Sequence, residues 1–183
     1  MYFYDQIIMG KILYSIEIKT GKLDELSADT LICPADEQFS IFAPAVLSLF
    51  PSGKTGLLIP DTDSRLPAGM AAAFQSDLTA FPFLVLASLG STVSLVKPSV
   101  FRKAIYYSLL VAEANQFASV VISVPDFIST GLSETDFTEN LVEMLRKFRQ
   151  ESGILKSVVL WIPDQPLATR VKVDLISKIP EMV

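Results

Sequence analysis

The stretch SVVISVPDFISTGLSETDF, residues 119–137, combines three local signals that decide the fold class. Residues 119–124 are rich in β-branched apolar side chains, which favours a buried strand. Residues 128–133, Ile-Ser-Thr-Gly-Leu-Ser, form a turn, and an acidic segment typical of a helix start follows it. A strand, a small-residue turn and a helix in this order is the geometry by which α/β proteins present backbone N–H groups to an anion.

Strands and helices alternate along the rest of the chain. Apolar runs predict strands at residues 12–18, 30–33, 84–88, 120–124 and 158–162, with Pro34 expected to end the second of them. Apolar side chains at helical spacing predict helices at about 99–117, 135–150 and 167–179, and residues 51–69 are predicted to be mostly loop. We therefore predict one domain, residues 1–183, with a three-layer α/β/α sandwich around a mixed, mostly parallel sheet.

The composition is unusually apolar. Half of the 183 residues are hydrophobic, and the mean hydropathy is +0.44. A sheet buried on both faces is the commoner cause, and a homo-oligomer interface is the alternative. No apolar run approaches the ~20 residues that a membrane span needs, so no membrane association is expected. Cys33 is the only cysteine, which excludes an internal disulfide and predicts a cytoplasmic protein.

Charge and histidine content exclude several function classes. The net charge is −5 and the basic residues are scattered, so no binding of a nucleic-acid duplex is expected. The chain has no histidine, which excludes Ser-His-Asp and Cys-His nucleophiles and His-ligated zinc. No metal or cofactor is predicted, and any chemistry must use carboxylates, hydroxyls, Lys, Arg, the thiol or the backbone.

Several motifs are better explained without a ligand. Residues 51–56, Pro-Ser-Gly-Lys-Thr-Gly, are similar to the end of a phosphate loop, but Ser48 stands where that loop needs a glycine. Residues 61–65 resemble the opening of a calcium loop, but its turn glycine and its bidentate acid are missing. Both segments are predicted to be surface loops. Cys33 and Trp161 lie in apolar strands and are predicted to be core residues.

Two parts of the chain together resemble the macro domain family. Residues 20–23, Thr-Gly-Lys-Leu, and residues 28–36, ADTLICPAD, are similar to that family's Gly-Asp-Ile-Thr turn and to the strand after it, which ends in Asn-Ala-Ala-Asn. Residues 119–133 resemble the strand and Ser-Thr-Gly-Ile-Tyr loop that wraps the diphosphate of ADP-ribose. Weaker similarities at 66–71, 81–90 and 158–164 extend the resemblance over residues 11–179. It implies a macro-type fold and an ADP-ribose-like small-molecule ligand.

The sequence departs from the family pattern at the positions that would contact this ligand. Lys22 stands in place of the aspartate that binds adenine, and its ammonium group has no hydrogen-bond acceptor. Asp36 stands in place of an asparagine that contacts ribose. Residues 39–43, Phe-Ser-Ile-Phe-Ala, replace the first, glycine-rich phosphate loop, and their bulk would obstruct the approach of a pyrophosphate.

These observations leave three hypotheses. The first is a divergent macro-type domain that binds a nucleotide-like or other small anionic ligand. The second loop would supply the donors, from Ser129, Thr130, Gly131, Leu132 and Ser133, and Lys22 and Asp36 would lie at the rim. The second is a non-binding macro-type domain that serves protein contacts, in which the loop's Ser and Thr only cap a helix. The third, an ADP-ribosyl hydrolase, is disfavoured by the bulky, apolar first loop.

Overall fold

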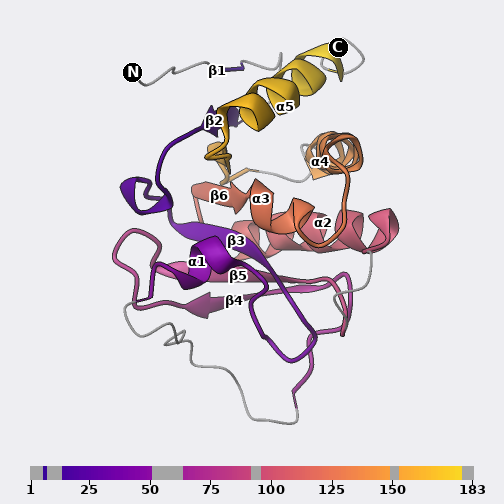
Figure 1. Ribbon diagram of the computed structural model, residues 1–183. Coiled ribbons are helices and arrows are strands. Elements are labelled where there is room, and N and C mark those ends of the chain that lie inside the picture. The colour runs from indigo at the N-terminus through magenta and orange to yellow at the C-terminus, as the bar shows by residue number, and fades with distance from the viewer. Residues whose placement is uncertain (1–5, 8–13, 51–63, 92–95, 149–152, 179–183) are drawn as a thin grey trace.

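The computed structural model describes residues 6–7, 14–50, 64–91, 96–148 and 153–178. Its centre is a seven-stranded sheet with the order β1-β2-β7-β6-β3-β5-β4 (Figure 1). Strands β2, β7, β6, β3 and β5 run parallel, and β1 and β4 pair antiparallel at the two edges. The predicted mixed, mostly parallel sheet is therefore confirmed. Its strands are β1 Gln6–Ile7, β2 Ser15–Lys19, β3 Thr30–Ala35, β4 Ala71–Gln75, β5 Phe83–Ser88, β6 Ser119–Ser123 and β7 Ser157–Trp161.

Helices cover both faces of the sheet, but unequally. Long helices α2 (Pro98–Ala114), α4 (Glu134–Phe148) and α5 (Gln165–Lys178) pack against one face. Against the other face lie the short helix α1 (Pro44–Leu47) and the 3-10 helix η1 (Leu23–Glu25). A further short helix, α3 (Val124–Ile128), directly follows β6. The result is the predicted three-layer sandwich. None of the helices that the structure describes is both long and apolar enough to cross a bilayer.

The core consists of two apolar clusters, one on each face of the sheet. Successive residues of β3 alternate between them: Leu31 and Cys33 belong to one cluster, and Ile32 belongs to the other. Every residue of β3 is buried. Burial on both faces of the sheet accounts for the apolar composition. In the described part of the chain, the exposed large apolar side chains are only Met70, Tyr107, Val173 and Ile176.

Strand β3 continues through Pro34 to Ala35, so the prediction that Pro34 ends it was wrong. Strand β6 pairs with β3 only over Thr30–Ile32, whereas β5 pairs with it as far as Ala35. The Pro34 carbonyl accepts the Phe42 N–H at 3.0 Å, on the side away from β5. The missing N–H of Pro34 therefore faces a side where no strand requires a donor.

Strand β4 was not predicted from the sequence. Its first three residues are alanines, which have weak strand propensity and give no alternation of apolar and polar side chains. Its register comes from antiparallel pairing with β5, from Ala71 opposite Ala87 to Gln75 opposite Phe83. The phosphate-loop-like residues 51–56, and most of the calcium-loop-like residues 61–65, lie outside the described residues.

Candidate functional site

Two cavities lie where the five parallel strands end, the edge at which open α/β sheets bind ligands. One, the apolar cavity, has a volume of about 250 Å³ and is lined by segments that follow β3, β5 and β6. The other, the Lys22 cavity, has a volume of about 470 Å³ and is lined by residues at the ends of β2 and β7. Helix α1 stands between them, because Pro44 and Leu47 line the apolar cavity while Ala45 and the following Ser48 line the Lys22 cavity.

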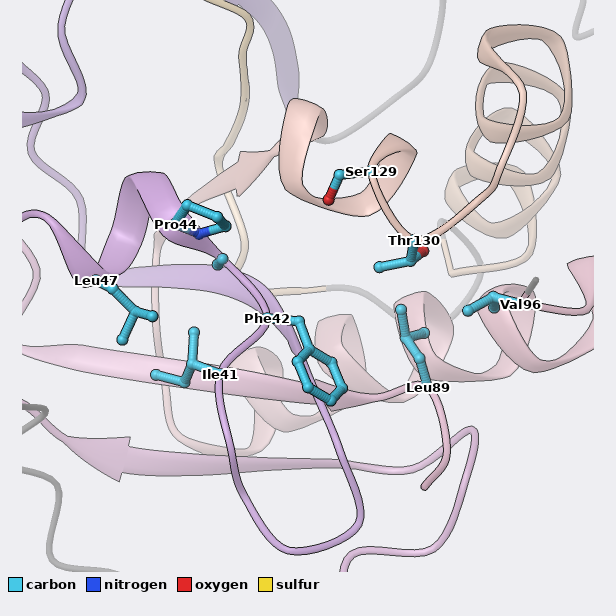
Figure 2. Close-up of a pocket in the computed structure, with 9 residues that line it drawn as sticks. Ile41, Phe42, Pro44, Leu47, Leu89, Val96, Ser129 and Thr130 are labelled. Carbon is cyan, nitrogen blue, oxygen red and sulfur yellow. The ribbon is translucent and has the colours of Figure 1, made fainter. Parts of the chain in front are cut away.

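The walls of the apolar cavity come from three separate parts of the chain (Figure 2). Ile41 and Phe42 lie on the loop between β3 and α1, and Leu89 follows β5. Ser129 and Thr130, at the end of α3, supply its polar side chains. The bulky residues of the first loop thus form walls of the cavity and do not fill it.

The Lys22 cavity has a different chemistry. Lys22 and Asp24, both exposed, lie at its rim, and the aromatic face of Trp161 and the side chain of Leu49 contribute apolar surface. Trp161 is only 5% exposed, and its indole N–H donates to the Gly21 carbonyl at 3.1 Å, which fixes the ring. Trp161 is a core residue as predicted, but sequence reasoning missed that it also lines a cavity.

The turn at residues 128–133 uses most of its donors internally. The backbone N–H groups of Ser129, Thr130 and Gly131 donate to carbonyl oxygens of α3 at 2.9, 3.2 and 3.0 Å. The hydroxyl groups of Ser129 and Thr130 also donate to α3 carbonyls, at 2.7 and 2.6 Å. These donors, which the sequence suggested for a ligand, therefore stabilise the end of α3.

The second half of the turn begins α4. Gly131 has φ 96°, the left-handed conformation that was expected of it, and Leu132 is buried. Ser133 caps α4: its hydroxyl oxygen accepts the Asp136 N–H at 2.9 Å, and the hydroxyl donates to the Asp136 carboxylate at 2.7 Å. The amide N–H groups of Leu132 and Ser133 find no acceptor among the described residues.

Three carboxyl groups near this turn are each engaged by a partner. Arg170 pairs with Glu134 at 2.8 and 2.9 Å, and this hydrogen bonding lowers the pKa of Glu134. Asp136 is held by Ser133, as described above. Asp126 is buried and accepts a hydrogen bond from the Ser123 hydroxyl. Of the three, Glu134 has a cationic partner that offsets its charge, whereas the Ser133 hydroxyl leaves the charge of Asp136 in place.

Asp126 joins the two short helices of the site. It lies on α3, and its carboxylate also accepts the N–H of Ala45 in α1. Burial raises the pKa of Asp126, and its hydrogen bonds with Ser123 and Ala45 oppose this shift only in part. Sequence reasoning missed this residue, although the spacing of Ser123 and Asp126 resembles that of a capping box. Because α1 lines both cavities, its hydrogen bond with Asp126 helps to position the segment that separates them.

The Cys33 thiol is inert. Cys33 is fully buried in β3, and burial raises the pKa of its thiol, with a further contribution from the nearby Asp126 carboxylate. The thiolate needed for nucleophilic attack is therefore not formed at neutral pH. This agrees with the prediction that Cys33 is a core residue.

Asp36 organises the first loop. Its Oδ1 atom accepts the N–H groups of Gln38 and Ser40, both at 2.7 Å. Between them, Phe39 has φ 66° and packs edge-to-face on Phe74 with ring centroids 5.3 Å apart. Phe39 is thus directed toward β4 and does not line either cavity.

The seven predicted site residues do not form one cluster. Lys22 lines the Lys22 cavity, and Ser129 with Thr130 lines the apolar cavity on the other side of α1. The remaining four residues line neither of these cavities; they are Asp36, Gly131, Leu132 and Ser133.

Comparison with solved structures identifies similar folds. The macro domain of ganglioside induced differentiation associated protein 2 matches with a TM-score of 0.68 at 16% identity, over 98% of this chain and 93% of that one. An Oceanobacillus iheyensis macrodomain with ADP matches with a TM-score of 0.74 at 8% identity, over all of both chains. A Trypanosoma brucei macrodomain in complex with ADP matches with a TM-score of 0.65 at 14% identity, over 87% of this chain and 68% of that one. No protein-family model and no curated protein matches this sequence.

Proposed function

Because the chain has the macrodomain fold, we propose that it binds a nucleotide-like small molecule at the carboxyl edge of its sheet. The observation that carries this proposal is the pair of cavities on either side of α1 at that edge. Support also comes from fold neighbours, since the Oceanobacillus and Trypanosoma macrodomains have structures with ADP and a mutant of the former has one with ADPR.

In this proposal the Lys22 cavity takes the flat ring of the ligand. Its volume of about 470 Å³ is within the ~300–1,000 Å³ typical of small-molecule pockets. Trp161 and Leu49 offer apolar surface to a ring, and the ammonium group of Lys22 offers donors to a phosphate or a ring acceptor.

We expect weak binding, with a dissociation constant on the order of 0.1–1 mM. The turn at 128–133 keeps only part of the donors of a complete diphosphate site, since three of its amides are used within α3. The apolar first loop adds no basic side chain, and Asp36 is committed to its own turn.

A fluorescence titration tests this proposal directly. Trp161 is the only tryptophan, so its emission reports on the Lys22 cavity alone. We expect ADP-ribose or AMP to change this emission in a saturable manner, and Lys22→Ala to weaken the effect several-fold. Lys103→Ala, which removes an exposed lysine on α2, is the matched control and is expected to leave binding unchanged. No response of Trp161 to either nucleotide at tens of millimolar would refute the proposal.

The alternative, a macro-type domain that serves protein contacts without a small-molecule ligand, has one observation in its favour. The hydroxyls of Ser129 and Thr130 and the first three amides of the turn stabilise α3 instead of facing a ligand. A thermal-shift screen separates the two functions, because a ligand that binds only the native state must raise the melting temperature.

Hydrolysis is not proposed, since the apolar cavity is lined, among the described residues, by no acid or base.

A further inference from the structure

We infer that the apolar cavity binds an uncharged, largely apolar moiety with at most one donor group, such as an amide NH₂, and that it excludes phosphate. This inference goes beyond the proposed function, because it concerns the cavity on the other side of α1 from the Lys22 cavity. It follows from the walls, the available hydrogen-bonding atoms and the size of the apolar cavity.

The walls give a charged group no compensation. In Figure 2 the side chains of Phe42, Leu89 and Val96 lie around the cavity together with Leu47 and Ile41. None of the residues that line the cavity in the described part of the chain is lysine or arginine. Burying an anion in such surroundings is unfavourable, because a buried charge must be paired or extensively hydrogen-bonded.

Six of the eight backbone N–H groups on these walls donate to carbonyl oxygens, and those of Ile41 and Ala43 find no acceptor among the described residues. The N–H groups of Phe42 and Leu89 donate to carbonyls of β3 at 3.0 and 2.9 Å. Ser129 and Thr130 donate their N–H groups within α3, and Pro44 has none to offer. A phosphate in this cavity would therefore exchange its hydration for few hydrogen bonds, which makes its entry unfavourable.

The polar side-chain atoms of the walls are acceptors. The hydroxyl hydrogens of Ser129 and Thr130 are directed to α3 carbonyls at 2.7 and 2.6 Å, so each Oγ atom keeps its lone pairs for another partner. In Figure 2 the Ser129 oxygen points toward the cavity and the Thr130 methyl group lies on the cavity side, so a ligand N–H or O–H can donate to Ser129, whereas an anionic oxygen meets a lone pair. The cavity thus discriminates between a donor and an anion of the same shape.

The size of the cavity limits the group that enters it. A dry, apolar cavity of ~150 Å³ accommodates benzene. The volume here is about 250 Å³, which leaves room for a single substituted ring or a short acyl chain. Benzamide and benzoate are suitable probes, because they are nearly identical in shape and differ in charge and in the presence of an N–H donor.

An NMR titration of the full chain with benzamide, benzoate and inorganic phosphate tests this inference. We expect benzamide to shift the methyl signals of Leu89 and Val96 and the amide of Thr130, with binding at least tenfold tighter than that of benzoate. Phosphate should leave these signals unchanged. Equal binding of benzoate or phosphate at these residues, or no shift with benzamide, would overturn the inference.

A filling variant gives a second, independent test. Val96→Phe places a ring against the cavity and should abolish the benzamide shifts at Leu89 and Thr130. Val173→Phe makes the same change on the exposed face of α5 and should have no effect. Circular dichroism verifies that both variants fold. If Val96→Phe does not fold, the comparison of benzamide with benzoate on the wild-type protein still tests the inference.

Different measurements test the proposed function and this inference, so each can be refuted separately. Loss of the Trp161 response to nucleotides, with benzamide still bound near Val96, would refute the proposed function and leave the chemistry of the apolar cavity intact. A Trp161 response to ADP-ribose, without discrimination between benzamide and benzoate, would refute this inference and leave the proposed function standing.

Discussion

Replacing Asp126 by Asn should make the protein more stable at neutral and alkaline pH. Asp126 is 4% exposed, and its carboxylate is hydrogen-bonded to the Ser123 hydroxyl and the Ala45 N–H. The Asn amide keeps both links, because its oxygen accepts from Ala45 while its NH₂ group donates to the Ser123 oxygen. The substitution therefore removes a buried ionisable group and leaves the connection between α1 and α3 in place.

The direction of the pH dependence follows from the raised pKa of Asp126. An aspartate in the unfolded chain loses its proton near its ordinary pKa of about 3.9. In the folded protein Asp126 keeps its proton to a higher pH. Its contribution to the free energy of unfolding is therefore fully present below the unfolded-state pKa of about 3.9 and is lost as pH rises through the raised pKa of the folded state. Each unit of the shift corresponds to about 1.4 kcal/mol, which Asp126→Asn recovers above the raised pKa.

Asp126→Ala should behave in the opposite way. It leaves the Ala45 N–H and the buried Ser123 hydroxyl without this acceptor, and the unsatisfied hydroxyl alone should cost about 1–3 kcal/mol at every pH. Both variants are compared with the wild type by urea unfolding between pH 4.5 and 8.5. Asp77→Asn, at an exposed carboxyl, controls for net charge. If the wild type and Asp126→Asn show parallel pH profiles, the reasoning about Asp126 is refuted.

Three further predictions concern the turn, the thiol and association. Gly131→Ala should lower the free energy of unfolding by about 1–2 kcal/mol, because Gly131 has φ 96°; Gly153→Ala, at an ordinary φ, should change little in the same urea assay. Cys33 should resist iodoacetamide in the native protein and react in urea, and rapid native alkylation would contradict its burial. Val173 is exposed on α5 and is available for burial in a homo-oligomer interface. Val173→Asp should therefore reduce association, measured by sedimentation at micromolar concentration. A monomeric wild type would contradict this prediction.

The sequence predicted the central strands well because their signal is local. Strands β3, β5, β6 and β7 are short runs of mostly apolar residues, and each is buried over most of its length. Pro34 shows where such reasoning fails. A proline is excluded from a strand when the neighbour on the side of its nitrogen needs an N–H donor, and the extent of pairing with β6 is not visible in the sequence.

The site was predictable at the level of residue types but not of hydrogen bonds. Ser133 as a helix cap and Gly131 as a left-handed residue follow from local rules, and both are observed. The sequence does not indicate that residues 124–128 form α3, which uses the N–H groups of the turn. Nor does it indicate that Asp126, apparently a surface acid, reaches a backbone group of α1 that is 81 positions earlier in the chain.

Fold and ligand are encoded by different parts of this chain, which explains how its fold matches macrodomains at 8–16% identity. The fold requires apolar strands in a given order, and many residues satisfy each buried position. The ligand depends on a few side chains and N–H groups in the loops after those strands, where one bulky residue changes the chemistry. Here Ile41 and Phe42 make one end of the crevice apolar, while Lys22 and Asp24 bring charged groups of both signs to the other end. The ligand should therefore be sought by the chemistry of these two cavities, with ADP-ribose as only one member of the series tested.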